Sequence, residues 1–127
     1  MKSRTFFLIG SAGGLLAVAL GAFGAHSLKS QLSAEMLSAF ETGVRYQMYH
    51  SLALFVVAYA LGIYARPQFA IAGWLFVAGI VLFSGSLYAM TATEMTWLGA
   101  VTPVGGLSFL AGWLVLCYGF WKVQSIT

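Results

Sequence analysis

Charged side chains are scarce in this sequence. Of its 127 residues, six are Lys or Arg and three are Glu. Charged residues make up 7% of the chain, whereas soluble domains carry about 25%. Hydrophobic residues reach 61%, and the mean hydropathy is +0.90. Too few polar groups remain to cover a water-soluble globule, and a disordered chain would have the opposite composition. The sequence therefore predicts an integral membrane protein.

Several kinds of functional residue are also missing. Cys117 is the single cysteine, so no disulfide framework can form within the chain. The six basic residues are scattered and form no patch for nucleic acid. Two histidines and one distant cysteine are too few for a zinc site. His26 and His50 sit on different expected helices, as haem ligands do, but they serve equally well as hydrogen-bonding partners. We therefore expect no metal and no cofactor.

Enzyme motifs are absent as well. The chain has neither a GxSxG nucleophile elbow nor an HExxH helix, and no glycine-rich loop of the kind that cradles phosphate. The only Ser-Gly-Ser, at residues 84–86, lacks a neighbouring acid or base in the sequence. We therefore expect that the protein is not an enzyme.

Four apolar stretches are each long enough to cross a bilayer, which takes roughly 20 residues. They cover residues 5–25, 46–65, 68–90 and 102–121, and none contains a charge. The runs are continuously apolar, which favours helices over the alternating strands of a membrane barrel. Thr102 is the expected N-cap of the fourth helix. The prediction is an all-α, single-domain (1–127) integral membrane four-helix bundle.

Two segments allow alternative interpretations. The connection at residues 26–45 has apolar residues at helical spacing, which indicates either a short amphipathic outer helix or an extension of the second span. The first span follows two basic residues and resembles a signal peptide, but its apolar run exceeds the usual 7–15 residues. We expect this first span to be retained.

The basic residues predict the orientation. With four spans, both termini and the second connection share one side, which carries basic residues and no acidic one. The opposite side carries the three glutamates and the remaining two basic residues. Because basic residues concentrate in cytoplasmic connections, we expect both termini in the cytoplasm. The two sets are Lys2, Arg4, Arg66 and Lys122 on the inside, and Lys29, Arg45, Glu35, Glu41 and Glu94 on the outside.

Glycines recur at helical spacing in the first and fourth spans. In lipid the hydrophobic effect contributes little between helices, so small residues that allow close approach mark the contacts. We expect these glycines to pack the bundle, with contacts between copies in a homo-oligomer as the alternative. They are Gly10, Gly14, Gly21, Gly24, Gly105 and Gly112.

Polar side chains are predicted to collect at one depth, in the outer third of the bundle. We expect Tyr46, Gln47 and His50 to face the bundle and to meet His26 and the serines of the third span. Polar groups at membrane depth face each other or water, so the cluster is either a hydrogen-bonded plug or a site for a ligand, ion or partner. Its candidate residues are His26, Arg45, Tyr46, Gln47, Tyr49, His50, Ser84, Ser86, Tyr88 and Thr102.

Four ordered motifs are familiar. They read GAFGAH at 21–26, YQMYH at 46–50, LFSGSLY at 82–88, and TPVGG at 102–106 followed by FLAGW at 109–113. With these motifs, essentially the whole chain resembles the small bacterial inner-membrane proteins of domain-of-unknown-function family 423. The resemblance implies a four-helix protein of the bacterial cytoplasmic (inner) membrane, with no established activity.

The functional prediction is a small accessory, scaffold or ligand-binding membrane protein with its polar cluster near the periplasmic face. Its expected partners are the lipid bilayer and a second copy or another membrane protein, but not nucleic acid. The alternative is a transporter or channel for ions or small solutes that acts as a homo-oligomer. Transport has less support, because all three glutamates lie in the outer connections and no polar path continues inward.

Overall fold

The computed structural model describes residues 2–124, and within this range every regular element is helical. Four helical runs are long and apolar enough to cross a membrane, as predicted. The first joins α1 (Lys2–Phe23) to a π-helical turn, η1 (Gly24–Leu28). The second is α2 (Ala34–Tyr64). The remaining elements are α3 (Pro67–Gly79), the π-helical turn η2 (Ile80–Ser84), α4 (Gly85–Thr93), the 3-10 turn η3 (Thr96–Ala100) and α5 (Thr102–Trp121).

The second span begins earlier than its apolar stretch. Helix α2 starts at Ala34, where the hydroxyl of Ser33 caps it by accepting a hydrogen bond from Met36 N at 3.2 Å. The structure therefore has the extension of the second span, and residues 34–45 form its first three turns. The expected N-cap at Thr102 is wrong, because Val101 precedes the helix and Thr102 is its first residue.

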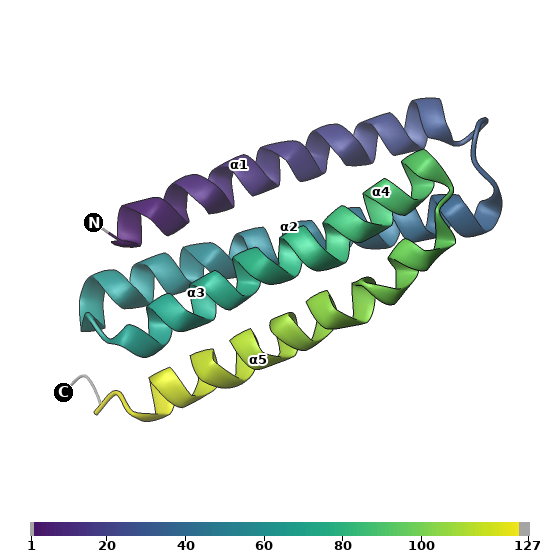
Figure 1. The fold of residues 1–127 in the computed structure, drawn as a ribbon. Coiled ribbons are helices and arrows are strands. Elements are labelled where there is room, and N and C mark those ends of the chain that lie inside the picture. Colours follow the sequence, from purple (N-terminus) through teal and green to yellow (C-terminus); the bar gives the residue numbers. More distant parts are fainter. Residues whose placement is uncertain (1, 125–127) are drawn as a thin grey trace.

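The helices form an antiparallel bundle in which α2 and α3 are central (Figure 1). Helix α1 packs mainly along α2, and α5 mainly along α3. Helix α1 begins, and α5 ends, at the same end of the bundle, which we call the terminal end (Figure 1). The α2–α3 connection also lies there, where Ala65 in the left-handed conformation (φ 50) reverses the chain before Pro67 opens α3. The opposite end, with the other two connections, is the loop end.

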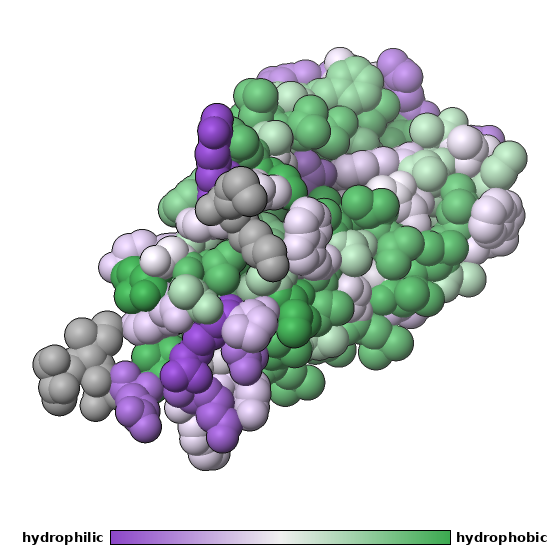
Figure 2. All heavy atoms as spheres, turned by 60° about the vertical axis from the view of Figure 1, so that its left-hand side comes forward, coloured by the Kyte–Doolittle hydropathy of each residue, from purple (hydrophilic) through white to green (hydrophobic). Residues whose placement is uncertain are grey.

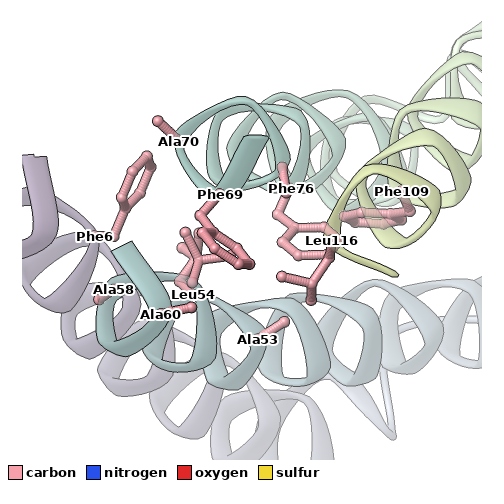
Figure 3. Packing of buried hydrophobic residues seen from close by; sticks show 12 residues of the cluster. Phe6, Ala53, Leu54, Ala58, Ala60, Phe69, Ala70, Phe76, Phe109 and Leu116 are labelled. Atoms are coloured by element: carbon pink, nitrogen blue, oxygen red, sulfur yellow. The ribbon is translucent and has the colours of Figure 1, made fainter. Parts of the chain in front are cut away.

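The core combines aromatic rings with alanines. Phe69 and Phe76 of α3 point between α2 and α5, where they meet Leu54 and Ala53 of α2 and Leu116 of α5 (Figure 3). The small α2 residues leave room for the phenylalanine rings, which brings the two central helices close together. This core fills the half of the bundle toward the terminal end.

Glycines bring the outer helices close to the central pair. A methyl group on Gly10 would lie 2.8 Å from Ser51 O, and one on Gly112 would lie 2.7 Å from the Phe76 ring. On Gly105 it would meet the backbone of Phe83. A methyl group on Gly24 would lie 2.8 Å from the Phe40 ring, and one on Gly21 would lie 3.3 Å from Val44.

Gly14 departs from this pattern. A methyl group there would find only Met48 Sδ, at 4.0 Å, whereas one on neighbouring Gly13 would meet Ser51 Oγ. The tight α1–α2 contact therefore runs through Gly13 rather than Gly14. The helical spacing of the glycines in the sequence predicts which side of α1 packs against another helix. It does not predict which of two adjacent glycines touches the partner helix.

The flanks of the bundle are apolar. Figure 2 shows hydrophobic residues over most of the visible side, with hydrophilic residues gathered toward the ends. Large side chains such as Leu15 on α1 and Leu114 on α5 are more than two thirds exposed, at 71% and 72%. In a membrane protein these faces contact lipid tails or another transmembrane helix.

Candidate functional site

The predicted polar residues do not form one cluster. Gln47 and His50 are both buried on α2, but Gln47 points toward α1 and α4 and His50 points toward α5. The expectation that Tyr46, Gln47 and His50 would together meet His26 and the serines of the third span at one depth is therefore wrong. The polar side chains instead make several separate contacts, each of which joins two or three helices.

Gln47 joins three helices. Its Nε2 donates to Gly13 O of α1 at 2.8 Å, and its Oε1 accepts from the Tyr88 hydroxyl of α4 at 2.7 Å. On the same side of α2, the buried Ser84 hydroxyl donates to Gly43 O at 2.6 Å. These bonds satisfy polar groups that would otherwise be costly at membrane depth.

A second contact joins α4 to α5. The hydroxyls of Ser86 and Thr102 lie 2.6 Å apart, and Ser86 also donates to Phe83 O at 2.9 Å. Because a hydroxyl has one proton, Thr102 is the donor when Ser86 bonds to the Phe83 carbonyl. The side chain expected to cap α5 therefore bonds to the neighbouring helix instead.

His50 is held from both ring nitrogens. Its Nδ1 lies 2.6 Å from Tyr46 O, and its Nε2 lies 3.1 Å from Trp113 Nε1. A carbonyl only accepts and an indole N–H only donates, so these partners assign the neutral tautomer with the proton on Nδ1. The Phe109 ring stacks on the imidazole with a centroid separation of 3.5 Å and an interplanar angle of 8°. Neither nitrogen is left for a ligand.

Two predicted residues lie outside these contacts. His26 is exposed in η1 at the loop end, and within residues 2–124 its side chain makes no hydrogen bond. Arg45 is exposed and donates to Thr42 Oγ1 at 3.1 Å, on its own helix. Both side chains therefore lie at the surface of the loop end.

His50 also lies deeper than expected, since the sequence predicted its position in the outer third of the bundle. Because α2 begins at Ala34, His50 lies about midway along this 31-residue helix. Its contact with Phe76 is about 14 Å along α3 from Pro67. Polar groups therefore extend from the loop end to the middle of the bundle.

A hollow opens between α2 and α5, and we call it the α2–α5 groove. Its volume is about 760 Å³, and six of its ten lining residues carry aromatic rings. It opens on the flank of the bundle, where Leu107 and Leu110 are 66% and 62% exposed. The lining residues are Tyr46, Tyr49, His50, Phe83, Pro103, Gly106, Leu107, Phe109, Leu110 and Trp113.

Two hydroxyls in this groove have no partner. Within residues 2–124, the phenol groups of Tyr46 and Tyr49 make no hydrogen bond, and both side chains are exposed. The Tyr46 ring itself is fixed, because it packs 4.6 Å from the Phe83 ring between centroids. The groove thus combines a ring-lined wall with two free donor groups.

A second groove lies between α1 and the third span, and we call it the α1–α4 groove. It has a volume of about 470 Å³, and the polar side chains in it, Gln47 and Tyr88, already bond to each other. The π-helical turn η2 separates the two hollows, with Ile80 facing this one and Phe83 facing the other. Such turns interrupt helices frequently at functional sites.

Trp113, Phe109 and Phe83 were missed as site residues. One signal was present, because Trp113 lies in mid-span whereas tryptophans in membrane proteins favour the interfaces. An indole N–H at that depth needs an acceptor, and His50 supplies it. The other two rings carried no signal that distinguishes them from ordinary core residues.

Comparison with known proteins places the chain in a family. The model of the family described as "Protein of unknown function (DUF423)" matches residues 20–106. The UPF0382 membrane protein YwdK of Bacillus subtilis is 47% identical over 89% of this chain and 93% of its own length. A UPF0382 membrane protein of Haemophilus influenzae is 43% identical over 99% of this chain and 100% of its own length. No solved structure matches the chain significantly. The chain therefore belongs to the DUF423 family, whose curated relatives are UPF0382 membrane proteins.

Proposed function

We propose that this protein is a non-enzymatic accessory protein of the bacterial cytoplasmic membrane that binds a membrane-dissolved ligand in the α2–α5 groove. The observation that carries this proposal is the groove itself, about 760 Å³ with ring walls and two unpartnered phenol hydroxyls. Sites for small molecules are concave and mostly apolar, with a few polar groups and volumes of about 300–1,000 Å³. The ligand enters from the lipid through the flank of the bundle.

The other polar contacts support this proposal, because they leave only some polar groups of the groove free to bind a ligand. Gln47, Ser84, Ser86 and His50 all bond within the protein, so they hold the helices around the groove. Among the groove's side chains, the two tyrosine hydroxyls remain for a ligand. A hydroxyl at membrane depth without a partner is costly, and a bound acceptor removes that cost.

The proposed orientation has the terminal end in the cytoplasm. Arg4, Arg66 and Lys122 lie at that end, whereas all three glutamates of the chain lie at or near the loop end. Basic residues favour the cytoplasmic side. The α2–α5 groove, which reaches Pro103 at the loop end of α5, then opens toward the outer leaflet.

Transport has weaker support from the geometry. A path for ions or polar solutes needs polar groups along its whole length. The half of the bundle toward the terminal end is instead filled by residues such as Leu54, Phe69 and Leu116, all at most 4% exposed. Both nitrogens of His50 are also engaged. These features favour ligand binding without translocation.

Filling the groove tests the proposal. A side chain at Gly106 would enter the α2–α5 groove, where a Cβ would lie 3.9 Å from the Phe83 ring, so Gly106→Leu fills it without a backbone clash. Gly85→Leu is the matched control, because Gly85 lines the α1–α4 groove and its Cβ would lie 4.0 Å from Ile80 O. Each protein is extracted with its surrounding lipid into polymer discs, and the lipid-soluble molecules are measured by mass spectrometry.

We expect one class of molecule to be enriched by the wild type and by Gly85→Leu, and to be depleted from Gly106→Leu. Identical profiles in all three proteins would overturn ligand binding in the α2–α5 groove. Reconstituted vesicles provide a second measurement, because ion or solute flux that is present in the wild type and lost in Gly106→Leu would establish the transporter instead.

A further inference from the structure

We propose that the ligand of the α2–α5 groove is an isoprenoid quinone, held by its uncharged ring. This inference rests on the proposed function, since it names the chemical class that the groove accepts. It concerns binding alone, with no redox step. Three features of the groove point to this class: the rings of its wall, its two free hydroxyls and the absence of charge in its lining.

The wall is suited to a flat conjugated ring. The Phe83, Tyr46 and Phe109 rings pack against one another, with centroids 4.6 Å apart for Tyr46 and Phe83, 6.2 Å apart for Tyr46 and Phe109, and 5.5 Å apart for Phe83 and Phe109. Behind them, His50 stacks on Phe109, which fixes the plane of that ring. Aromatic pairs favour stacked or edge-to-face arrangements, so rings held in place select a planar partner. A flexible acyl chain gains no such preference.

The polar groups select an uncharged acceptor. Tyr46 and Tyr49 each offer a phenol O–H, and their ring centroids lie 5.7 Å apart. His50 cannot contribute, because both of its nitrogens bond within the protein. The lining contains no Lys, Arg or Glu, so a phospholipid headgroup would find no counter-charge there. A quinone has carbonyl oxygens that only accept hydrogen bonds, and it carries no charge.

The length of the α2–α5 groove is also compatible with a quinone ring and the start of its tail. From Pro103 to Trp113 the groove follows α5 over ten residues, which is about 15 Å. This length exceeds that of a single ring and leaves space for the first part of a prenyl tail. The rest of the tail leaves through the opening beside Leu107 and Leu110, which are exposed on the flank. The ring enters by the same route, directly from the bilayer.

Tryptophan fluorescence tests this proposal with a control tryptophan at a position outside the groove. Trp113 lines the groove and is 46% exposed, whereas Trp74 on α3 is 51% exposed and packs against Phe6 instead. Two single-tryptophan proteins keep either Trp113 or Trp74, with the other three tryptophans replaced by Phe. Both are reconstituted in lipid nanodiscs and titrated with decylubiquinone. Circular dichroism checks that both proteins retain their helices.

We expect decylubiquinone to quench Trp113 in a saturable manner and Trp74 only in proportion to its concentration in the bilayer. Replacing Tyr46 and Tyr49 with Phe should weaken the saturable phase by about fivefold for each hydroxyl that the ligand uses. The control is Tyr59→Phe, since Tyr59 lies on α2, is 66% exposed and does not line the groove. That variant should leave the midpoint of quenching unchanged.

Phospholipids with brominated acyl chains separate the remaining outcomes. If decylubiquinone quenches both tryptophans alike while brominated chains quench Trp113 more than Trp74, the groove holds a lipid tail. That result overturns the quinone proposal and leaves the proposed function in place. If neither quencher distinguishes Trp113 from Trp74, both proposals are wrong. Saturable quenching whose midpoint is unchanged by the loss of both hydroxyls would also overturn the assigned ligand class.

Discussion

Two adjacent glycines at the start of α5 provide a sharp test of how closely this helix approaches the third span. A methyl group on Gly105 would meet the backbone nitrogen of Phe83 and would lie 2.7 Å from its Cα and Cβ. A methyl group on Gly106 would find only the Phe83 ring, at 3.9 Å. The two Ala variants therefore differ in packing but share the same helix, depth and chemistry.

The expected free energies follow from two contributions. Replacing glycine by alanine within a helix removes a penalty of about 0.8–1.0 kcal/mol at either position. Forcing an extra methyl group into a packed contact costs about 1–3 kcal/mol, and only Gly105 has such a contact because the opposing atoms are backbone. Gly106→Ala should then stabilise the fold by about 1 kcal/mol. Gly105→Ala should be about 1–3 kcal/mol less stable than Gly106→Ala, because the propensity contribution cancels.

The measurement is unfolding in mixed micelles, with increasing SDS in a mild detergent and circular dichroism as the readout. The difference between the two unfolding free energies is the decisive quantity, since it removes any common effect of the detergent. Equal stabilities, or a less stable Gly106→Ala, would show that α5 does not pack against the backbone of η2. The α2–α5 groove, whose wall is Phe83, would then have a different shape.

Two further predictions concern the Gln47 contact and the orientation. In a double-mutant cycle of Gln47→Leu and Tyr88→Phe, we expect a coupling free energy of about 0.6 kcal/mol, and no more than about 1.7 kcal/mol, as is typical between transmembrane helices. The same unfolding assay should give zero coupling if the hydrogen bond of 2.7 Å between Gln47 and Tyr88 is absent in the membrane. In a Cys117→Ser background, a membrane-impermeant maleimide applied to whole cells should label Lys29→Cys but not Lys122→Cys, and the reverse pattern would invert the proposed orientation.

The four membrane crossings were predictable because their signal is local. Each span is recognised from its own residues as a continuous apolar run of bilayer length, so no knowledge of neighbouring helices is needed. The start of α2 was harder to locate, because Glu35, Glu41 and Arg45 interrupt the hydropathy where the helix continues. Helical spacing of the apolar residues indicated the extension as one of two alternatives. Choosing between them required the cap at Ser33 and the tertiary contacts of the first turns.

The partners of buried polar residues were not predictable in the same way. Gln47 and His50 are three residues apart, so their side chains leave α2 about 60° from one another. That angle is small enough to suggest a common sector, yet α1 and α5 occupy different sides of α2, and each helix takes one of the two residues. The spacing of two residues in a helix gives the angle between their side chains. Which helix lies next to each side chain depends on the packing of the whole bundle.

The position of the groove follows from where close packing stops. Toward the terminal end, Phe69 and Phe76 fill the space between α2, α3 and α5, and the core is continuous. Beyond Gly79 the third span changes to the π-helical turn η2, and the α2–α5 groove lies on one side of this turn. The hydrogen bond between the Ser86 and Thr102 hydroxyls holds α5 to α4, and the one from Trp113 to His50 holds α5 to α2. Because α5 is held in these two ways, the hollow cannot close by a simple collapse of the helix. An open groove at that depth is accordingly a built feature of the bundle, and its free tyrosine hydroxyls are the groups on which its function should depend.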